Sequence, residues 1–464
     1  MLVIAVIIYF LVTLLLGFYA SKKVHQAGDF INAGRNLHPA INTAALFALW
    51  FGSETVFGAS SEFATHGIRG IIEDPLGGVL CLLLVGIFFS RKLYSLNVYT
   101  IGDLFRQRYG SKVEALSAVL MIISFIGYAA GQIVALGLIT QTLTGFPLSA
   151  SMFLGAAIVV VYTFTGGMWA VSLTDFLQSI LIVSGLLAIA WYVTDMAGGS
   201  TKVMSALTPE HRKFFPENTG TEWVNWFAAW MVLGFGSIAS QDVFQRINSA
   251  RSVRAAYKST IAGAVIYLVF SMVPLYLVLA VKVLDPSLLE GDMQMMLPRM
   301  VMTHMPVWLQ MLFFGSVLSA VMSTCSGALL APASLLSENL IKPLFSGSMN
   351  DARFLLLTRI SVVMVGSAAL IIAQSSQNIF HLVGEASVIG LVSIFVPFVA
   401  SLFLHHTNSG GAVVSMVSGS MVYAVFRIWD ITEINPLVPG LLAGIAGLWL
   451  GDRLTNAFTS INKA

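Results

Sequence analysis

The chain has 464 residues, of which 57% are hydrophobic and only 10% are charged, and its formal net charge is +2. Soluble domains carry about 25% charged residues, so this composition excludes an ordinary water-soluble protein. The small net charge also argues against a nucleic-acid partner. The two cysteines, Cys81 and Cys325, stand inside apolar runs, which argues against a disulfide framework or a zinc site.

Apolar runs long enough to cross a bilayer recur along the whole sequence. Runs of this length indicate α-helices and exclude a β-barrel. The first run has no basic residue before it and no cleavage pattern after it, so we interpret it as a retained span and not as a signal peptide. We predict an all-α integral membrane protein with about thirteen transmembrane helices, at about 2–20, 41–66, 71–95, 116–143, 149–167, 171–195, 223–243, 256–281, 308–339, 354–375, 379–404, 411–428 and 436–451.

The basic residues predict the orientation of these spans. With the N-terminus outside, 17 of the 24 Lys and Arg residues fall on the inner side and 7 on the outer side. Because basic residues favour the cytoplasmic side, the C-terminus is expected in the cytoplasm and the protein in the plasma (inner) membrane.

Two longer loops, 196–222 and 282–307, are then expected outside. The second is rich in methionine and is expected to form an external lid. Its thioethers could bind copper as soft ligands, or could simply fill gaps in a lid helix.

Two of the spans contain a polar, glycine-rich interruption. The second span carries Gly52, Ser53 and Glu54 in mid-helix, and the seventh carries Gly234–Ser240. Broken helices line the binding sites of many transporters, although glycines can also serve only to pack helices closely.

The two breaks lie five helices apart, which predicts two five-helix repeats. In this division, 1–40 is a leading helix and loop, 41–195 and 223–404 are the repeats, and 405–464 holds two trailing helices.

Three of the acidic residues inside the spans stand out, because a charge there is costly and usually functional. Glu54 lies in the first break, Asp175 near the start of the sixth span, and Glu385 in the eleventh. Glu54 and Glu385 could face a cationic substrate, take part in ion coupling, or be protonated. Asp175 could be only a helix-end acid, because negative charge is favourable near a helix N-terminus.

Hydroxyl side chains cluster in the ninth span. Ser323, Thr324 and Ser326 stand beside Gly327. Such hydroxyls often only bond back to their own helix. Facing a broken helix, however, hydroxyls and freed carbonyls together offer a sodium ion uncharged oxygen ligands.

Several motifs resemble the sodium:solute symporter family. The stretch Tyr162–Gln178 (YTFTGGMWAVSLTDFLQ) matches its Y-T-x-x-G-G-x-x-A-V-x-x-T-D-x-x-Q pattern, and Asp242, Gln245 and Arg246 match the loop after its sixth core helix. The stretch from Trp50 to Tyr109 is similar to its choline and proline branches. The resemblance implies a LeuT-type fold of two inverted five-helix repeats with flanking helices.

The resemblance also implies functional residues. The main sodium site would be formed by Ala48, Phe51, Ala320, Ser323 and Thr324. Asp175, Ser323 and Ser326 match a second sodium site or sodium path of some members, but Gly327 departs from that pattern. The substrate pocket would be lined by Trp50, Ser53, Glu54, Asp74, Gln132, Trp230, Phe235 and Glu385.

Together these features predict sodium-coupled symport of a small zwitterionic or cationic solute by alternating access. The expected partners are sodium, the solute and the bilayer; neither nucleic acid nor an obligate protein partner is expected. The absence of a nucleophile–base pair or an HExxH motif argues against an enzyme. The alternatives are a proton-coupled or uncoupled transporter, or a membrane sensor built on a transporter fold.

Overall fold

The computed structural model describes residues 1–217, 220–345, 349–375, 378–404, 406–429, 431 and 433–461, with side chains up to residue 457 in the last range. The predicted domain boundary at residue 405 and the last three residues of the chain lie outside the described residues.

The described part of the chain is helical throughout, with no β-strand. In the first half the helices are α1 (Leu2–Ser21), α2 (Ala27–Asn32), α3 (Pro39–Trp50), α4 (Ala59–His66), α5 (Gly78–Leu84), α6 (Ser90–Ser95), α7 (Ile101–Tyr109), α8 (Ser111–Thr144), α9 (Leu148–Met196) and α10 (Ser200–Ser205). In the second half they are α11 (Gly220–Gly236), α12 (Gln241–Ser249), α13 (Val253–Leu284), α14 (Met296–His304), α15 (Val307–Leu335), α16 (Asp351–Ala373), α17 (Ile379–Gly390), α18 (Val396–Phe403), α19 (Ser409–Trp429) and α20 (Leu437–Ile461).

Ten helical segments in the described residues are long and apolar enough to cross a membrane, or up to 11 if the bent pair α11 and α12 forms one span. Two of the ten, Glu54–Ser95 with 42 residues and Leu148–Met196 with 49, are too long for one crossing, because about 20 helical residues span the hydrocarbon core. The multi-pass helical architecture is therefore confirmed. The count of thirteen crossings stays a prediction.

Gly167 divides the longest of these segments. Its backbone adopts φ 50° and ψ −140°, a conformation that only glycine reaches easily. A Cβ at this position would also lie 2.4 Å from the carbonyl oxygen of Phe30. The glycine of the YTFTGG motif thus separates the two spans that the sequence predicts on either side of it.

The two interrupted spans lie beside each other in the bundle. The first break separates α3 from the π-helical segment Glu54–Gly58, and the second separates α11 from α12, which meet at 45°. A parallel backbone bridge between Leu37 and Ala250 joins the segment before α3 to the end of α12. Both breaks therefore lie where the sequence predicts them.

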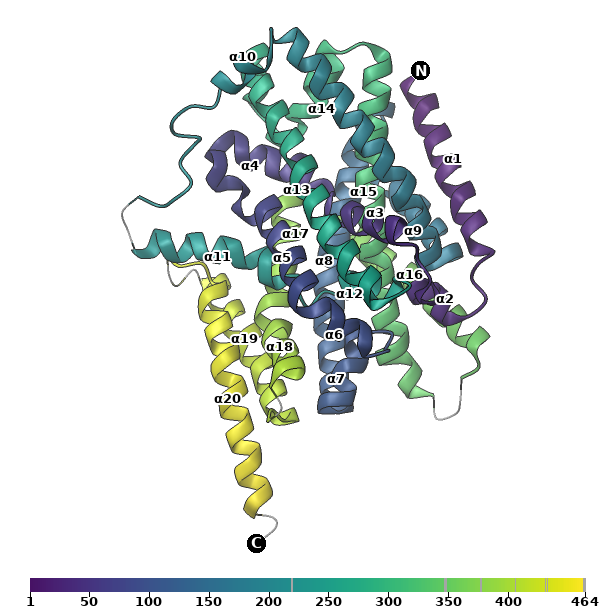
Figure 1. The fold of residues 1–464 in the computed structure, drawn as a ribbon, viewed down its shortest axis with the longest axis vertical. Helices are drawn as coiled ribbons and strands as arrows, with labels where there is room; N and C mark the ends of the chain where they lie inside the picture. Colours follow the sequence, from purple (N-terminus) through teal and green to yellow (C-terminus); the bar gives the residue numbers. More distant parts are fainter. Residues whose placement is uncertain are drawn as a thin grey trace.

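The remaining helices surround this centre (Figure 1). α1 packs along α9, where Gly17 leaves room for Tyr162; a Cβ on Gly17 would lie 2.8 Å from the Cβ of Tyr162. α19 and α20 pack against each other at the other flank, and α20 extends beyond the rest of the bundle. α15 is the most central long helix, and every residue from Ser316 to Leu335 is buried.

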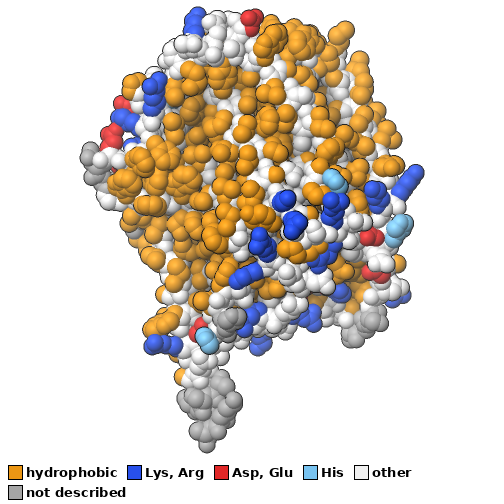
Figure 2. Space-filling view, in the orientation of Figure 1, with side chains coloured by type: hydrophobic (Ala, Val, Ile, Leu, Met, Phe, Trp, Pro, Cys, Tyr) orange, Lys and Arg blue, Asp and Glu red, His pale blue; other side chains and the backbone are white. Residues whose placement is uncertain are grey.

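The surface divides along the long axis of the molecule. Figure 2 shows hydrophobic side chains over most of the upper part of the visible face, while many of the visible Lys and Arg side chains lie from mid-height downward. Several Lys and Arg side chains of the protein stack on aromatic rings, such as Arg35 on Tyr94 at 3.9 Å and Lys92 on Phe403 at 3.6 Å. An apolar belt bordered by cations and aromatic rings is typical of a membrane protein.

Candidate functional site

The break after α3 frees backbone carbonyl groups in the centre of the bundle. α3 ends at Trp50, and Phe51 has φ −84° and ψ 71°, which takes the chain out of the helix. The carbonyl of Trp50 accepts hydrogen bonds from the Gly52 amide at 3.0 Å and the Thr55 hydroxyl at 3.1 Å. The carbonyl of Phe51 accepts no hydrogen bond from any described residue. The break therefore presents one unpaired carbonyl, as a cation site requires.

Three of the five predicted sodium ligands meet at Thr324. Its hydroxyl lies 3.2 Å from the carbonyl oxygen of Ala48, 3.2 Å from that of Ala320 and 3.1 Å from that of Leu49. A threonine hydroxyl has one proton to donate, so it cannot satisfy three carbonyl acceptors at once. This cluster of oxygens is fully buried, and its surplus of acceptors suits a small hard cation.

The predicted second sodium site already contains a cation from the protein. The Asp175 carboxylate accepts a hydrogen bond from the Ser323 hydroxyl at 2.5 Å and lies 3.3 Å from the Arg246 guanidinium. Both charged side chains are fully buried. Ser326 donates to the carbonyl of Ser323 and not to Asp175.

Gly327 explains how the guanidinium fits. A Cβ at this position would lie 3.0 Å from the Nη2 atom of Arg246. The residue that departs from the family pattern thus leaves room for Arg246. This arrangement lends no support to a second sodium beside Asp175. It also places Asp175 in a buried ion pair, and not at an exposed helix end.

Glu54 approaches the same oxygen cluster. Its carboxylate accepts hydrogen bonds from Gln132 at 2.8 Å, Tyr128 at 3.3 Å and Ser53 at 3.4 Å, all of them uncharged donors. A Cβ on Gly52 would lie 2.7 Å from the Glu54 carboxylate and 2.8 Å from the Thr324 hydroxyl, so both groups flank this glycine.

No Lys, Arg or His side chain in the described part of the chain lies within 4.0 Å of the Glu54 carboxylate. A buried carboxylate without a countercharge is costly. Glu54 therefore favours a cation next to Thr324.

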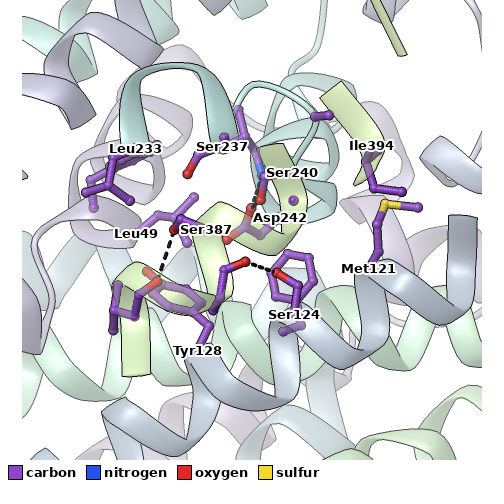
Figure 3. A pocket seen from close by; sticks show the side chains of 18 of the residues that line it. Leu49, Met121, Ser124, Tyr128, Leu233, Ser237, Ser240, Asp242, Ser387 and Ile394 are labelled. Carbon is purple, nitrogen blue, oxygen red and sulfur yellow. Dashed lines mark hydrogen bonds between the residues drawn. The ribbon is translucent and has the colours of Figure 1, made fainter. Parts of the chain in front are cut away.

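A cavity opens beside the two breaks (Figure 3). Its walls come from α3, α8, the break between α11 and α12, and α17. Trp50 and Glu54 are the predicted substrate residues that line it, and Ser53 and Gln132 are joined to Glu54 by hydrogen bonds. The lining residues include no Lys, Arg or His.

Asp74 lies one layer behind this cavity. Its carboxylate accepts a hydrogen bond from Tyr267 at 2.6 Å and lies 3.0 Å from the Thr55 hydroxyl, and the side chain is buried. Because the Thr55 hydroxyl also lies 3.1 Å from the carbonyl oxygen of Trp50, Asp74 supports the residues of the break. The structure therefore gives it a supporting position and no contact with the cavity.

Three predicted substrate residues lie elsewhere. Trp230 packs in an aromatic cluster with Phe214 and Trp226, with ring centroids 6.4 and 5.9 Å away. Phe235 meets Phe395 edge-on at 5.6 Å. Neither ring is among the residues that line the cavity. Both rings therefore lie outside the walls of this cavity, and their role in substrate binding stays a prediction.

Glu385 also lies outside this cavity and lines a separate one with Tyr423 and Arg427. Its carboxylate lies 2.8 Å from the Nε atom of Arg427, accepts a hydrogen bond from Tyr423, and lies 3.5 Å from His381. The side chains of Glu385 and Arg427 are 30% and 48% exposed. Arg427 on α19 thus compensates the charge of Glu385 in this structure, and a role for Glu385 in substrate binding stays a prediction.

Other cavity residues were missed by the sequence reasoning. They are Ser124, Phe125 and Tyr128 on α8, Ser237, Ser240 and Asp242 at the second break, and Ser387 on α17. The sequence could have indicated Asp242 as a cavity residue, since it is an acidic residue directly after the predicted break. The residues on α8 had none, because every face of that helix is largely apolar.

Comparison with known proteins agrees with this architecture. The family model described as "Sodium:solute symporter family" matches residues 30–419. The human high affinity choline transporter 1 is 27% identical over 440 residues, covering 90% of this chain and 75% of the relative. The high-affinity proline transporter PutP of Bacillus subtilis is 24% identical over 465 residues, covering 96% of each chain.

Solved structures share the fold. The substrate-bound, outward-open structure of a Na⁺-coupled sialic acid symporter superposes with a TM-score of 0.84 at 20% identity, covering 98% of each chain. A nucleobase-cation-symport-1 family transporter in a closed conformation gives a TM-score of 0.63 at 18% identity. The fold is therefore LeuT-type, as predicted. Because the matched family and the relatives are transporters, the prediction that the protein is not an enzyme is also confirmed.

Proposed function

Because the chain belongs to the sodium:solute symporter family, we propose that it uses sodium entry to drive uptake of a small organic solute bearing a cationic or zwitterionic group. The observation that carries this proposal is the oxygen cluster at Thr324. There a helix break and α15 bring three carbonyl oxygens within 3.2 Å of one hydroxyl. Ala48, Ala320 and Thr324, together with the free carbonyl of Phe51, would hold the ion.

Ser323 is the fifth predicted ligand. Its hydroxyl donates to Asp175 at 2.5 Å, so its lone pairs are still available for a cation. A bound sodium ion would supply positive charge beside Glu54, whose carboxylate has only uncharged donors around it. In this proposal Glu54 is the countercharge of sodium.

The charge of the cavity supports the choice of solute. Its lining contains carboxylates but no basic side chain, so an anionic solute would have no partner. Choline, which the human relative is named for, is a quaternary ammonium compound, and proline is a zwitterion with an ammonium group. A solute of this class matches the acidic cavity, and the ring of Trp50 suits cation–π contact.

The orientation belongs to the same proposal. The N-terminus faces outward and the C-terminus faces the cytoplasm, in the plasma membrane, as the distribution of basic residues suggests. On the outer side, α17 closes over the first break, since a Cβ on Gly58 would lie 2.8 Å from the ring of Phe380. Alternating access would require this contact to open.

Proton coupling is the second candidate, favoured by the same uncompensated Glu54. A proton could neutralise this carboxylate in place of sodium. The two functions differ in the gradient that drives uptake, which is sodium in the first and protons in the second. Only sodium symport needs the oxygen cluster at Thr324.

Uptake of radiolabelled choline and L-proline into proteoliposomes separates them. We expect accumulation with an inward sodium gradient, and none with a proton gradient imposed in potassium buffer. Accumulation driven by the proton gradient alone would favour the second candidate. A sodium gradient that never drives uptake of either compound would contradict the first.

A further inference from the structure

A second acidic side chain faces the cavity from the other break. Asp242 lies in the first turn of α12, directly after the non-helical residues that follow α11. It lines the same cavity as Glu54, as do Ser237 and Ser240 next to it (Figure 3). The two carboxylates come from different repeats, one from each broken helix.

The hydrogen bonds of Asp242 leave one oxygen free. Its Oδ1 accepts hydrogen bonds from the Ser240 hydroxyl and, at 2.7 Å, from the Val243 amide. Its Oδ2 has no hydrogen-bond partner among the described residues. The side chain is therefore held in one orientation and still offers an acceptor to a ligand in the cavity.

The neighbouring arginine does not neutralise this charge. Arg246 stands one turn further along α12, but its guanidinium is engaged by Asp175 and by the carbonyl of Ala45 at 2.9 Å. Its contact with Asp242 is a hydrogen bond to the backbone carbonyl at 3.4 Å. Throughout the described ranges, no Lys, Arg or His lies within 4.0 Å of the Asp242 carboxylate.

The balance of charge leads to an assignment. With sodium beside Thr324, Glu54 has its countercharge. Asp242 has no cationic side chain in contact with its carboxylate and is stabilised by the N-terminus of α12, which acts as about half a positive charge, and by the more distant Arg246, which is already paired with Asp175. Resting on the proposed function, we infer that Asp242 is the residue that binds the ammonium group of the solute.

The cavity wall fits this assignment. The rings of Trp50, Phe125 and Tyr128 line the same space and suit the apolar part of a small ammonium compound. Specificity for cationic over neutral solutes then depends on Asp242, and sodium affinity depends on Thr324 and Glu54.

Binding measurements on the purified full-length protein test this division. Isothermal titration at saturating NaCl would use choline, glycine betaine, L-proline and L-lysine, and the uncharged choline isostere 3,3-dimethyl-1-butanol. Sodium affinity is measured separately, by thermal stabilisation in NaCl against KCl. The variants are Asp242→Asn, which keeps an Oδ1 acceptor for Val243, and Asp242→Glu, which keeps the charge.

Asp195→Asn is the matched control, because this aspartate is exposed at the end of α9. We expect Asp242→Asn to weaken the best ammonium ligand about 10- to 100-fold, since the contact between opposite charges is lost. For L-lysine and L-proline this contact includes an N–H hydrogen bond, whereas for choline and glycine betaine it is electrostatic alone. Its sodium midpoint and its affinity for the isostere should stay within about twofold of wild type. Asp242→Glu should recover part of the affinity, and Asp195→Asn should match wild type.

Three results would overturn the inference: unchanged ammonium affinity in Asp242→Asn, an equal loss of sodium affinity in that variant, or no binding of any of the four ammonium compounds by the wild type. The sodium measurement on the wild type keeps the two proposals apart. If sodium stabilises the wild type but Asp242→Asn binds ammonium normally, only the assignment of Asp242 fails. If sodium gives no stabilisation, the symport proposal itself fails.

Discussion

Replacing Thr324 with alanine tests the sodium site most directly. The substitution removes one ligand oxygen and the donor shared by Ala48, Leu49 and Ala320. A hydroxyl that contacts a charged partner contributes about 1.5–3 kcal/mol. Because 1.4 kcal/mol corresponds to a factor of ten, the sodium concentration for half-maximal stabilisation should rise about 10- to 150-fold.

The assay is the melting temperature of the purified protein across a NaCl series at constant ionic strength, followed by uptake into proteoliposomes under the same series. The matched control is Thr260→Ala on α13. This threonine is equally buried, but its hydroxyl only bonds back to the carbonyl of Ala256 at 2.8 Å. Each variant should lose about 1 kcal/mol of stability without sodium.

Only Thr324→Ala should shift the sodium midpoint. If both variants show the wild-type midpoint, the oxygen cluster is not the sodium site. If the sodium midpoints of both variants shift equally, the shift comes from a general destabilisation of the helix bundle, and the assignment of the sodium site to Thr324 is again contradicted.

Three further perturbations follow from the geometry. Gly52→Ala should abolish sodium-dependent uptake, because its Cβ would lie 2.7 Å from the Glu54 carboxylate and 2.8 Å from the Thr324 hydroxyl. The control Gly127→Ala should retain this uptake, because its Cβ would have no neighbour nearer than 3.7 Å. Arg246→Ala should destabilise the protein by about 3–5 kcal/mol in thermal or denaturant unfolding, since it leaves the buried Asp175 without its countercharge. Adding Asp175→Ala should recover part of this loss, and no recovery would argue against the ion pair. Glu385→Gln should leave the solute concentration for half-maximal uptake within about twofold of wild type, because this acid pairs with Arg427 at a partly exposed site, and a large increase would return Glu385 to the binding cavity.

The interruptions of the two broken helices could be predicted from sequence because they have a local cause. Gly52 and Ser53, like Gly236 and Ser237, are small or polar residues inside apolar runs, so the pattern itself marks the loss of helix. The hydroxyls on α15 were recognisable for the same reason. The contact between Thr324 and Ala48 could be predicted only from the family resemblance, since 276 residues separate the two and no local pattern joins them.

The partners of the acidic residues could not be predicted. Asp175 and Arg246 are 71 residues apart, and Glu385 and Arg427 are 42 apart, so no local pattern pairs them. From the sequence, Arg427 is one of the 7 basic residues expected on the outer side, and nothing in the sequence shows that it pairs with Glu385. For a helix apolar on most faces, hydropathy does not reveal which face meets which neighbour. For this reason Trp230 was expected in the cavity wall, although it packs in an aromatic cluster outside that cavity.

The pairing of Asp175 with Arg246 bears on how transport responds to membrane voltage. An elementary charge that crosses the full potential gains about 2.3 kcal/mol per 100 mV. If the two side chains, on α9 and α12, remain paired as the transporter changes state, they form a neutral unit and carry no net charge through the electric field. The electrical work of the cycle then falls on the sodium ion, the solute and the carboxylates of Glu54 and Asp242, and this buried pair adds nothing to the current measured per transported molecule.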